Sequence, residues 1–89
     1  MIETEITIIN KLGLHARASA KLASTAGHFS CVIKTGHNGK LVDAKSVMSL
    51  MLLAASQGTT LKFQFDGGDE VHAHQSIKAL IDDKFGEGQ

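Results

Sequence analysis

The sequence has no proline, tryptophan or tyrosine, a single cysteine and no excess of either charge. Nine lysines and arginines balance nine aspartates and glutamates, so no net positive field exists to attract nucleic acid or an anionic membrane. Cys31 cannot form an internal disulfide, which is typical of a reducing cytoplasm. The longest apolar stretch, Val47 to Ala55, is far shorter than the ~20 residues of a membrane helix. The acidic residues near the N-terminus do not resemble a signal peptide. These absences predict a cytoplasmic protein with no nucleic-acid partner and no membrane insertion.

What is present suits one small domain. A chain of 89 residues, 43% hydrophobic and 20% charged, can fold unaided, and we expect a single domain over 1–89 that is monomeric. A core of this size leaves no space for a deep catalytic cleft, so a stand-alone enzyme is the least favoured class. Any chemistry should occur at the surface, and no cofactor is expected.

Hydrophobic periodicity predicts four strands and three helices. Alternating apolar and polar residues predict strands over 2–8, 29–35, 41–42 and 61–65, with a hairpin turn at 36–39. Helical spacing, with Ser46 and Asp69 as N-caps and glycines as stops, predicts helices over 16–26, 47–55 and from Asp69 to Gly86. The order βαββαβα favours an α+β fold whose antiparallel sheet has helices on one face and solvent on the other.

His15 has the most informative setting of the five histidines because it directly precedes the first predicted helix. The amides of Ala16, Arg17 and Ala18 have no acceptor within that helix, and the helix dipole adds positive charge there. Such an end favours an anion, and Arg17 can add a charge-assisted hydrogen bond to a phosphate. The same positive end disfavours imidazolium and helps to keep the ring nucleophilic. From spacing alone, a His15 that merely ends a loop is an equally good interpretation.

The other four histidines do not predict a metal site. His72 and His74 are two residues apart, which places them on opposite sides of a helix, and His28 and His37 fall at a helix end and a turn. We therefore expect no bound metal. His74 is expected to pack at the edge of the core.

The predicted helix after Ser46 is too apolar to be buried on every side. Leu50 and Leu53 are expected in the core. A partner-docking surface is predicted from the remaining apolar positions of this helix and from the exposed side of the first helix. Its members are Val47, Met48, Met51, Ala20, Lys21 and Ser24.

Two segments give the chain a family resemblance. Gly13-Leu14-His15-Ala16-Arg17-Ala18-Ser19 and Lys45-Ser46-Val47-Met48-Ser49-Leu50-Met51, together with the order of the elements, resemble the histidine-containing phosphocarrier (HPr) family of the bacterial phosphotransferase system. The resemblance covers essentially the whole chain. It implies an open-faced β-sandwich, with four antiparallel strands and three helices on one face.

The resemblance also implies a function. His15 would accept a phosphoryl group through Nδ1 from the phosphoenolpyruvate-dependent first enzyme and pass it to IIA-type domains, while Arg17 would stabilise the phosphate. In many members the serine that matches Ser46 is phosphorylated by a dedicated kinase, so a kinase and phosphorylase acting on Ser46 are further expected partners. A phosphate there should hinder docking without unfolding the domain.

Two residues depart from the family pattern. Many members have proline where this chain has Ala18, and many have glycine where it has Ser49. Ala18 adds an amide donor to the predicted cradle, whereas Ser49 weakens the expectation of a kinase. Ala18-Ser19 leaves open a nitrogen-branch regulatory phosphocarrier with the same His15 chemistry beside the sugar-branch carrier. A regulatory adaptor that acts through phosphorylated Ser46 is less favoured, because adaptors of that kind lack the histidine.

Overall fold

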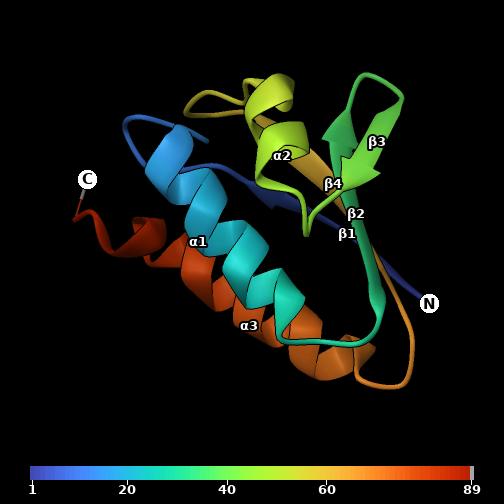
Figure 1. The fold of residues 1–89 in the computed structure, drawn as a ribbon. Helices are drawn as coiled ribbons and strands as arrows, with labels where there is room; N and C mark the ends of the chain where they lie inside the picture. Colours follow the sequence, from blue (N-terminus) through green and yellow to red (C-terminus); the bar gives the residue numbers. More distant parts are fainter. Residues whose placement is uncertain (89) are drawn as a thin grey trace.

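The computed structural model describes residues 1–88, which form one antiparallel sheet with three α-helices on one face (Figure 1). The strands are β1 (Ile2–Thr7), β2 (Val32–His37), β3 (Lys40–Asp43) and β4 (Thr60–Asp66). The helices are α1 (Ala16–Gly27), α2 (Val47–Leu53) and α3 (Glu70–Asp82), followed by the 3-10 helix η1 (Lys84–Gly86). The strand order β1-β4-β2-β3 places β1 and β3 at the edges of the sheet. This is the open-faced sandwich that the sequence predicts.

The two faces of the sheet follow from the alternation of side chains along the strands. β1 pairs with β4 in a register that sets Ile6 opposite Leu61 and Glu5 opposite Lys62. Ile6 and Leu61 are buried beneath the helices, whereas Glu5 and Lys62 are exposed on the open face. The sheet therefore contributes one apolar face to the core, including the stacked rings of Phe63 and Phe65.

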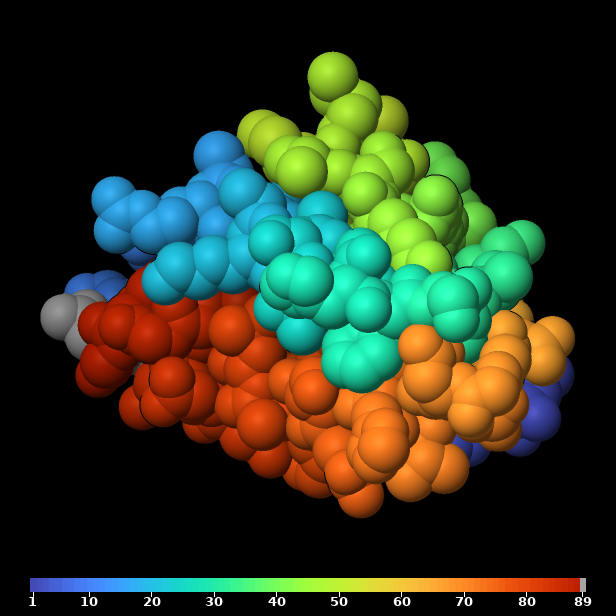
Figure 2. All heavy atoms as spheres, turned by 60° about the horizontal axis from the view of Figure 1, so that its bottom comes forward, coloured from blue at the N-terminus to red at the C-terminus, as the bar shows by residue number. Residues whose placement is uncertain are grey.

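Apolar residues spaced three or four apart in the sequence predict one buried face on each long helix, and the structure buries these faces. In α1 the buried side includes Ala18, Leu22 and Ala26, and in α3 it includes Ala73, Ile77 and Ile81. Figure 2 shows that α1 lies between α2 and α3 on the covered face of the molecule. Phe85 of η1 is completely buried, so the segment after α3 is also fixed to the core.

Several predicted boundaries were wrong. β2 begins at Val32 rather than Phe29, and α2 ends at Leu53 rather than Ala55. Ala54 adopts a left-handed conformation (φ 52°) and its amide donates to the Met51 carbonyl at 3.1 Å, so α2 ends before Gly58, the glycine that was predicted to end it. Likewise α3 ends at Asp82, before Gly86, because Lys84 and Phe85 have positive φ angles.

Asp69 stands at the N-cap position of α3 but does not cap it. Its carboxylate accepts hydrogen bonds from the amides of Ser30 and Cys31, at 2.9 and 3.0 Å. These bonds hold the segment before β2 to the start of α3 in place of strand pairing. The predicted side-chain cap at Asp69 was therefore wrong, and the same contact explains why β2 begins late.

Within residues 1–88, no helix combines the length and the apolar character needed to cross a membrane.

Candidate functional site

His15 is the N-cap residue of α1, with extended backbone angles (φ −71°, ψ 179°), yet its side chain makes no capping hydrogen bond. The first backbone bond of the helix runs from the Ser19 amide to the His15 carbonyl, at 2.8 Å. The amides of Ala16, Arg17 and Ala18 are therefore left without an intrahelical acceptor. The three residues predicted to form a phosphate cradle therefore lie at an open helix end.

The loop before His15 is fixed against the segment that follows α2. The Leu14 amide donates to the Ala55 carbonyl at 2.8 Å, and Gly13 adopts a positive φ of 66°. A Cβ atom on Gly13 would lie 2.4 Å from the Ala55 oxygen, so no larger residue fits without a shift of the backbone. This close approach sets the position at which the chain enters α1.

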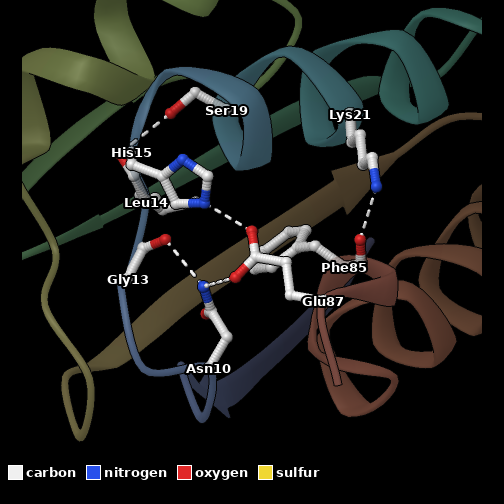
Figure 3. A network of polar contacts seen from close by, with 8 residues as sticks. All are labelled: Asn10, Gly13, Leu14, His15, Ser19, Lys21, Phe85 and Glu87. Atoms are coloured by element: carbon white, nitrogen blue, oxygen red, sulfur yellow. Dashed lines mark hydrogen bonds and ion pairs between the residues drawn. The ribbon is translucent and has the colours of Figure 1, made fainter. Parts of the chain in front are cut away.

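The imidazole of His15 is held by a residue from the other end of the chain (Figure 3). Nε2 of His15 contacts Oε2 of Glu87, and the side-chain amide of Asn10 donates to the other Glu87 oxygen at 3.0 Å. The same Asn10 amide donates to the Gly13 carbonyl at 2.9 Å. Asn10 is completely buried, so it is a rigid link between the loop and residue 87.

Two further contacts hold the segment that contains Glu87. Phe85 inserts into the core, and the Lys21 ammonium donates to the Phe85 carbonyl at 2.6 Å. Lys21 belongs to α1, so the same helix that begins at His15 also holds the segment that reaches its ring (Figure 3). His15 is therefore held by residues of α1 and of the segment that follows α3.

The site is an open hollow with charges of both signs. His15 is 27% exposed and the Glu87 side chain 13%. The lining comprises Lys11, Leu12, His15, Ala16, Arg17, Gly86 and Glu87. Burial opposes ionisation of Glu87, but the hydrogen bonds from His15 and Asn10 outweigh it and hold the pKa of this carboxyl below its usual range. At neutral pH Glu87 is therefore an anion.

Ser46 is the N-cap of α2, as predicted: its hydroxyl oxygen accepts a hydrogen bond from the Ser49 amide at 3.2 Å. Leu50 and Leu53 are buried, as predicted. Val47, Met48 and Met51 are exposed, by 39%, 70% and 44%.

All six predicted docking residues are exposed, and one of them, Lys21, also makes a contact within the protein. Ala20, Lys21 and Ser24 are exposed on α1, although Lys21 is also bound to the Phe85 carbonyl. Leu12, in the loop that leads to His15, and Leu52, on α2, are also exposed and were not among the predicted docking residues.

Asn10 and Glu87 were also missed by the sequence reasoning. Glu87 lies 72 residues from His15, and no periodic pattern connects them. The one available signal was Phe85, an apolar residue after the end of the predicted core face and followed by Gly86. A buried anchor at that point returns the segment to the body of the protein.

The remaining histidines lie apart from this site. His74 packs on Phe65 with ring centroids 5.3 Å apart, at the edge of the core as predicted. The Nε2 atom of His37 lies 3.3 Å from the Leu53 carbonyl. Among residues 1–88, no three histidine, cysteine or acidic side chains are arranged to hold a metal ion.

Comparison with known proteins gives one consistent result. The family model described as "PTS HPr component phosphorylation site" matches residues 2–83. The chain is 53% identical to phosphocarrier protein HPr of Cupriavidus necator over 89 residues, which cover all of both chains. It is 42% identical to phosphocarrier protein NPr of Shewanella violacea, covering 97% of this chain and 94% of that protein.

Solved structures of similar fold belong to the same group of proteins. A crystal structure of HPr from Thermoanaerobacter tengcongensis superposes with a TM-score of 0.94 at 45% identity, covering 98% of each chain. These matches define the class of the protein as a small phosphocarrier with an open-faced sandwich fold. The chain belongs to the HPr family of phosphocarrier proteins of the phosphotransferase system.

Proposed function

We propose that His15 is the residue that carries the phosphoryl group. The observation that supports this most directly is the start of α1, where the histidine leaves three amides free instead of capping them. A phosphate on the ring would lie against the amides of Ala16, Arg17 and Ala18, and the Arg17 guanidinium would add a charge-assisted hydrogen bond. The partially exposed ring is accessible to a donor and to an acceptor in turn.

The partners follow from the phosphotransferase system to which the family belongs. The phosphoryl group would come from the phosphoenolpyruvate-dependent first enzyme and pass to a IIA-type domain, in the cytoplasm, with this protein acting as a monomer. A shallow site suits this relay because each partner supplies the rest of the catalytic groups. The exposed apolar side chains of α2 would dock these partners, with Met48 and Met51 adapting to different surfaces. Ala20, Lys21, Ser24 and Val47 complete the proposed docking surface.

Ser46 is the proposed regulatory position. It lies beside Val47 and Met48, so a phosphate added by a kinase and removed by a phosphorylase would place negative charge within the docking surface. The fold should be retained, because a phosphate at the start of a helix is electrostatically favourable.

The test is phosphorylation with purified first enzymes. The protein is incubated with phosphoenolpyruvate and either the sugar-branch or the nitrogen-branch first enzyme, and acid-labile phosphate is measured. We expect labelling of the wild type and none of His15→Ala. Equal labelling of His15→Ala, or none of the wild type, would overturn the proposal.

The same experiment separates the two branches. The higher identity to an HPr than to an NPr favours the sugar branch. Faster labelling by the nitrogen-branch enzyme would instead assign the chain to the nitrogen branch.

A further inference from the structure

Glu87 makes a contact whose polarity is fixed. An ionised carboxylate has only acceptor atoms, so the ring nitrogen that bonds to it must be the donor. Nε2 of His15 bonds to Glu87, and therefore bears the hydrogen. A neutral imidazole has one such hydrogen, which leaves Nδ1 with a free electron pair.

We propose that Glu87, oriented by Asn10, is a positioning residue that keeps the hydrogen on Nε2 of His15 and so makes Nδ1 the nucleophile. The inference rests on the proposed function of His15 as the phosphoryl carrier. It assigns the choice of nitrogen to two residues outside the family's sequence signatures.

The orientation of Asn10 supports this role. Its amide nitrogen donates to both the Gly13 carbonyl and Glu87, whereas its side-chain oxygen is buried without a partner among residues 1–88. Reversing this side chain would set an oxygen against two acceptors, so the present orientation is strongly preferred. Asn10 therefore offers a fixed donor to residue 87, and Glu87 has its second oxygen free for the ring.

The free electron pair points where a phosphate would be bound. Figure 3 shows Nδ1 on the side of the ring away from Glu87, toward the first turn of α1. That turn presents the open amides of Ala16, Arg17 and Ala18. One contact thus sets both the tautomer and the direction of attack.

The transfer step needs no movement of a proton. The Nδ1 electron pair attacks the phosphorus of the phosphoryl group on the donor enzyme. The new P–N bond forms as the bond from phosphorus to the donor atom breaks, and the electrons of that bond stay on the donor atom. The His15 ring becomes a phosphoimidazolium cation, with the hydrogen still on Nε2 beside the Glu87 carboxylate. On transfer to an acceptor, the electron pair returns to Nδ1.

Glu87→Gln gives a sharp test because Asn10 dictates how the new side-chain amide must lie. The oxygen of that amide would face the Asn10 donor, which leaves its NH2 group facing His15. The NH2 group donates, so Nε2 must accept and the hydrogen moves to Nδ1. The substitution is therefore expected to invert the tautomer while preserving the size of the side chain.

The tautomer is read by two-bond nitrogen–proton NMR correlations of histidine-labelled protein at about pH 8, where an ordinary imidazole is neutral. We expect the Nε2–H form in the wild type and the Nδ1–H form in Glu87→Gln. Glu5→Gln is the control, since it removes the same charge on the open face of the sheet. A wild-type ring protonated on Nδ1, or a Glu87→Gln ring unchanged from the wild type, would refute the proposal.

Phosphorylation provides the second measurement. Glu87→Gln should be labelled about tenfold or more slowly than the wild type, and Glu5→Gln at the wild-type rate. Equal labelling rates for all three proteins would show that Glu87 has no role in the transfer. If the wild type is not labelled at all, the proposed function fails, whereas the tautomer measurement still reports whether Glu87 fixes the ring.

Discussion

The helices α1 and α2 both begin at a polar side chain, but the two starts differ. Ser46 accepts a hydrogen bond from an amide three residues away, so one amide of the first turn of α2 is paired locally. His15 leaves the first amides of α1 unpaired, and its ring instead contacts Glu87, 72 residues away. A local cap stabilises a helix but fills its anion-binding end. A distant contact holds the side chain and keeps that end open.

The largest loss of stability is expected at Gly13, where the loop before the open N-terminus of α1 contacts the rest of the protein. Gly13→Ala should lower the free energy of unfolding by about 2–4 kcal/mol, because the new Cβ would lie 2.4 Å from the Ala55 oxygen at a positive φ. Urea unfolding measures the loss. Gly58→Ala is the control: its φ is also positive, but a Cβ there meets no atom within 4 Å, so about 1 kcal/mol is expected. Equal losses would mean that the contact with Ala55 does not matter.

The second effect concerns the open amides. Arg17→Ala should slow phosphorylation about 10- to 100-fold, which corresponds to the ~1.5–3 kcal/mol of a charge-assisted hydrogen bond. Arg17 is exposed, so the free energy of unfolding should change by less than about 0.5 kcal/mol. Lys11→Ala removes another exposed cation from the same hollow. If it slows transfer equally, general charge rather than a bond from Arg17 explains the result.

The third prediction tests the local cap at α2. Ser46→Ala should cost about 1 kcal/mol of stability and leave phosphorylation of His15 unchanged. Ser46→Asp retains a capping side chain, so thermal unfolding should be near that of the wild type. Its added charge beside Val47 should weaken docking, visible as a higher KM for this protein in the assay with the first enzyme. An unchanged KM for Ser46→Asp would argue against regulation through charge.

The smallest effect, a change in stability with pH, is expected at the start of α3, where Asp69 neither caps its own helix nor leaves a site for an anion. Hydrogen bonds from the amides of Ser30 and Cys31 outweigh partial desolvation and hold the pKa of Asp69 below its ordinary 3.8. A lowered pKa in the folded state stabilises the protein above about pH 4, and this stabilisation is lost as the pH falls through the folded-state value. The stability advantage of the wild type over Asp69→Asn should therefore shrink below pH 3.8. Thermal unfolding across this range measures it, and a constant difference would contradict the linkage.

The features that could be predicted from the sequence are those with a short repeat. Alternation along β1 and β4 and the Ala18, Leu22, Ala26 spacing in α1 determine which side chains are buried, and they predicted the layers correctly. The Ser46 cap was predictable because donor and acceptor are three residues apart.

The wrong and missing predictions concern contacts between residues that are far apart in the sequence. Asp69 has the composition of an N-cap, but a bond to a loop that is distant in sequence competes for its carboxylate. Glu87 contacts His15, and Asn10 contacts Glu87, across a separation of more than 70 residues in the sequence, and buried Phe85 anchors the segment that contains Glu87. Contacts of this kind depend on tertiary structure, so they cannot be predicted from local sequence propensity.

The position of Glu87 has a practical consequence for anyone preparing the protein. In Figure 1 the start of β1 and the segment that follows α3 lie on opposite sides of the molecule. An affinity tag attached after residue 89 would begin three residues beyond Glu87, whose carboxylate contacts His15. A tag before Met1 would extend from the far end of β1 instead. Activity measurements should therefore use N-terminally tagged or cleaved protein.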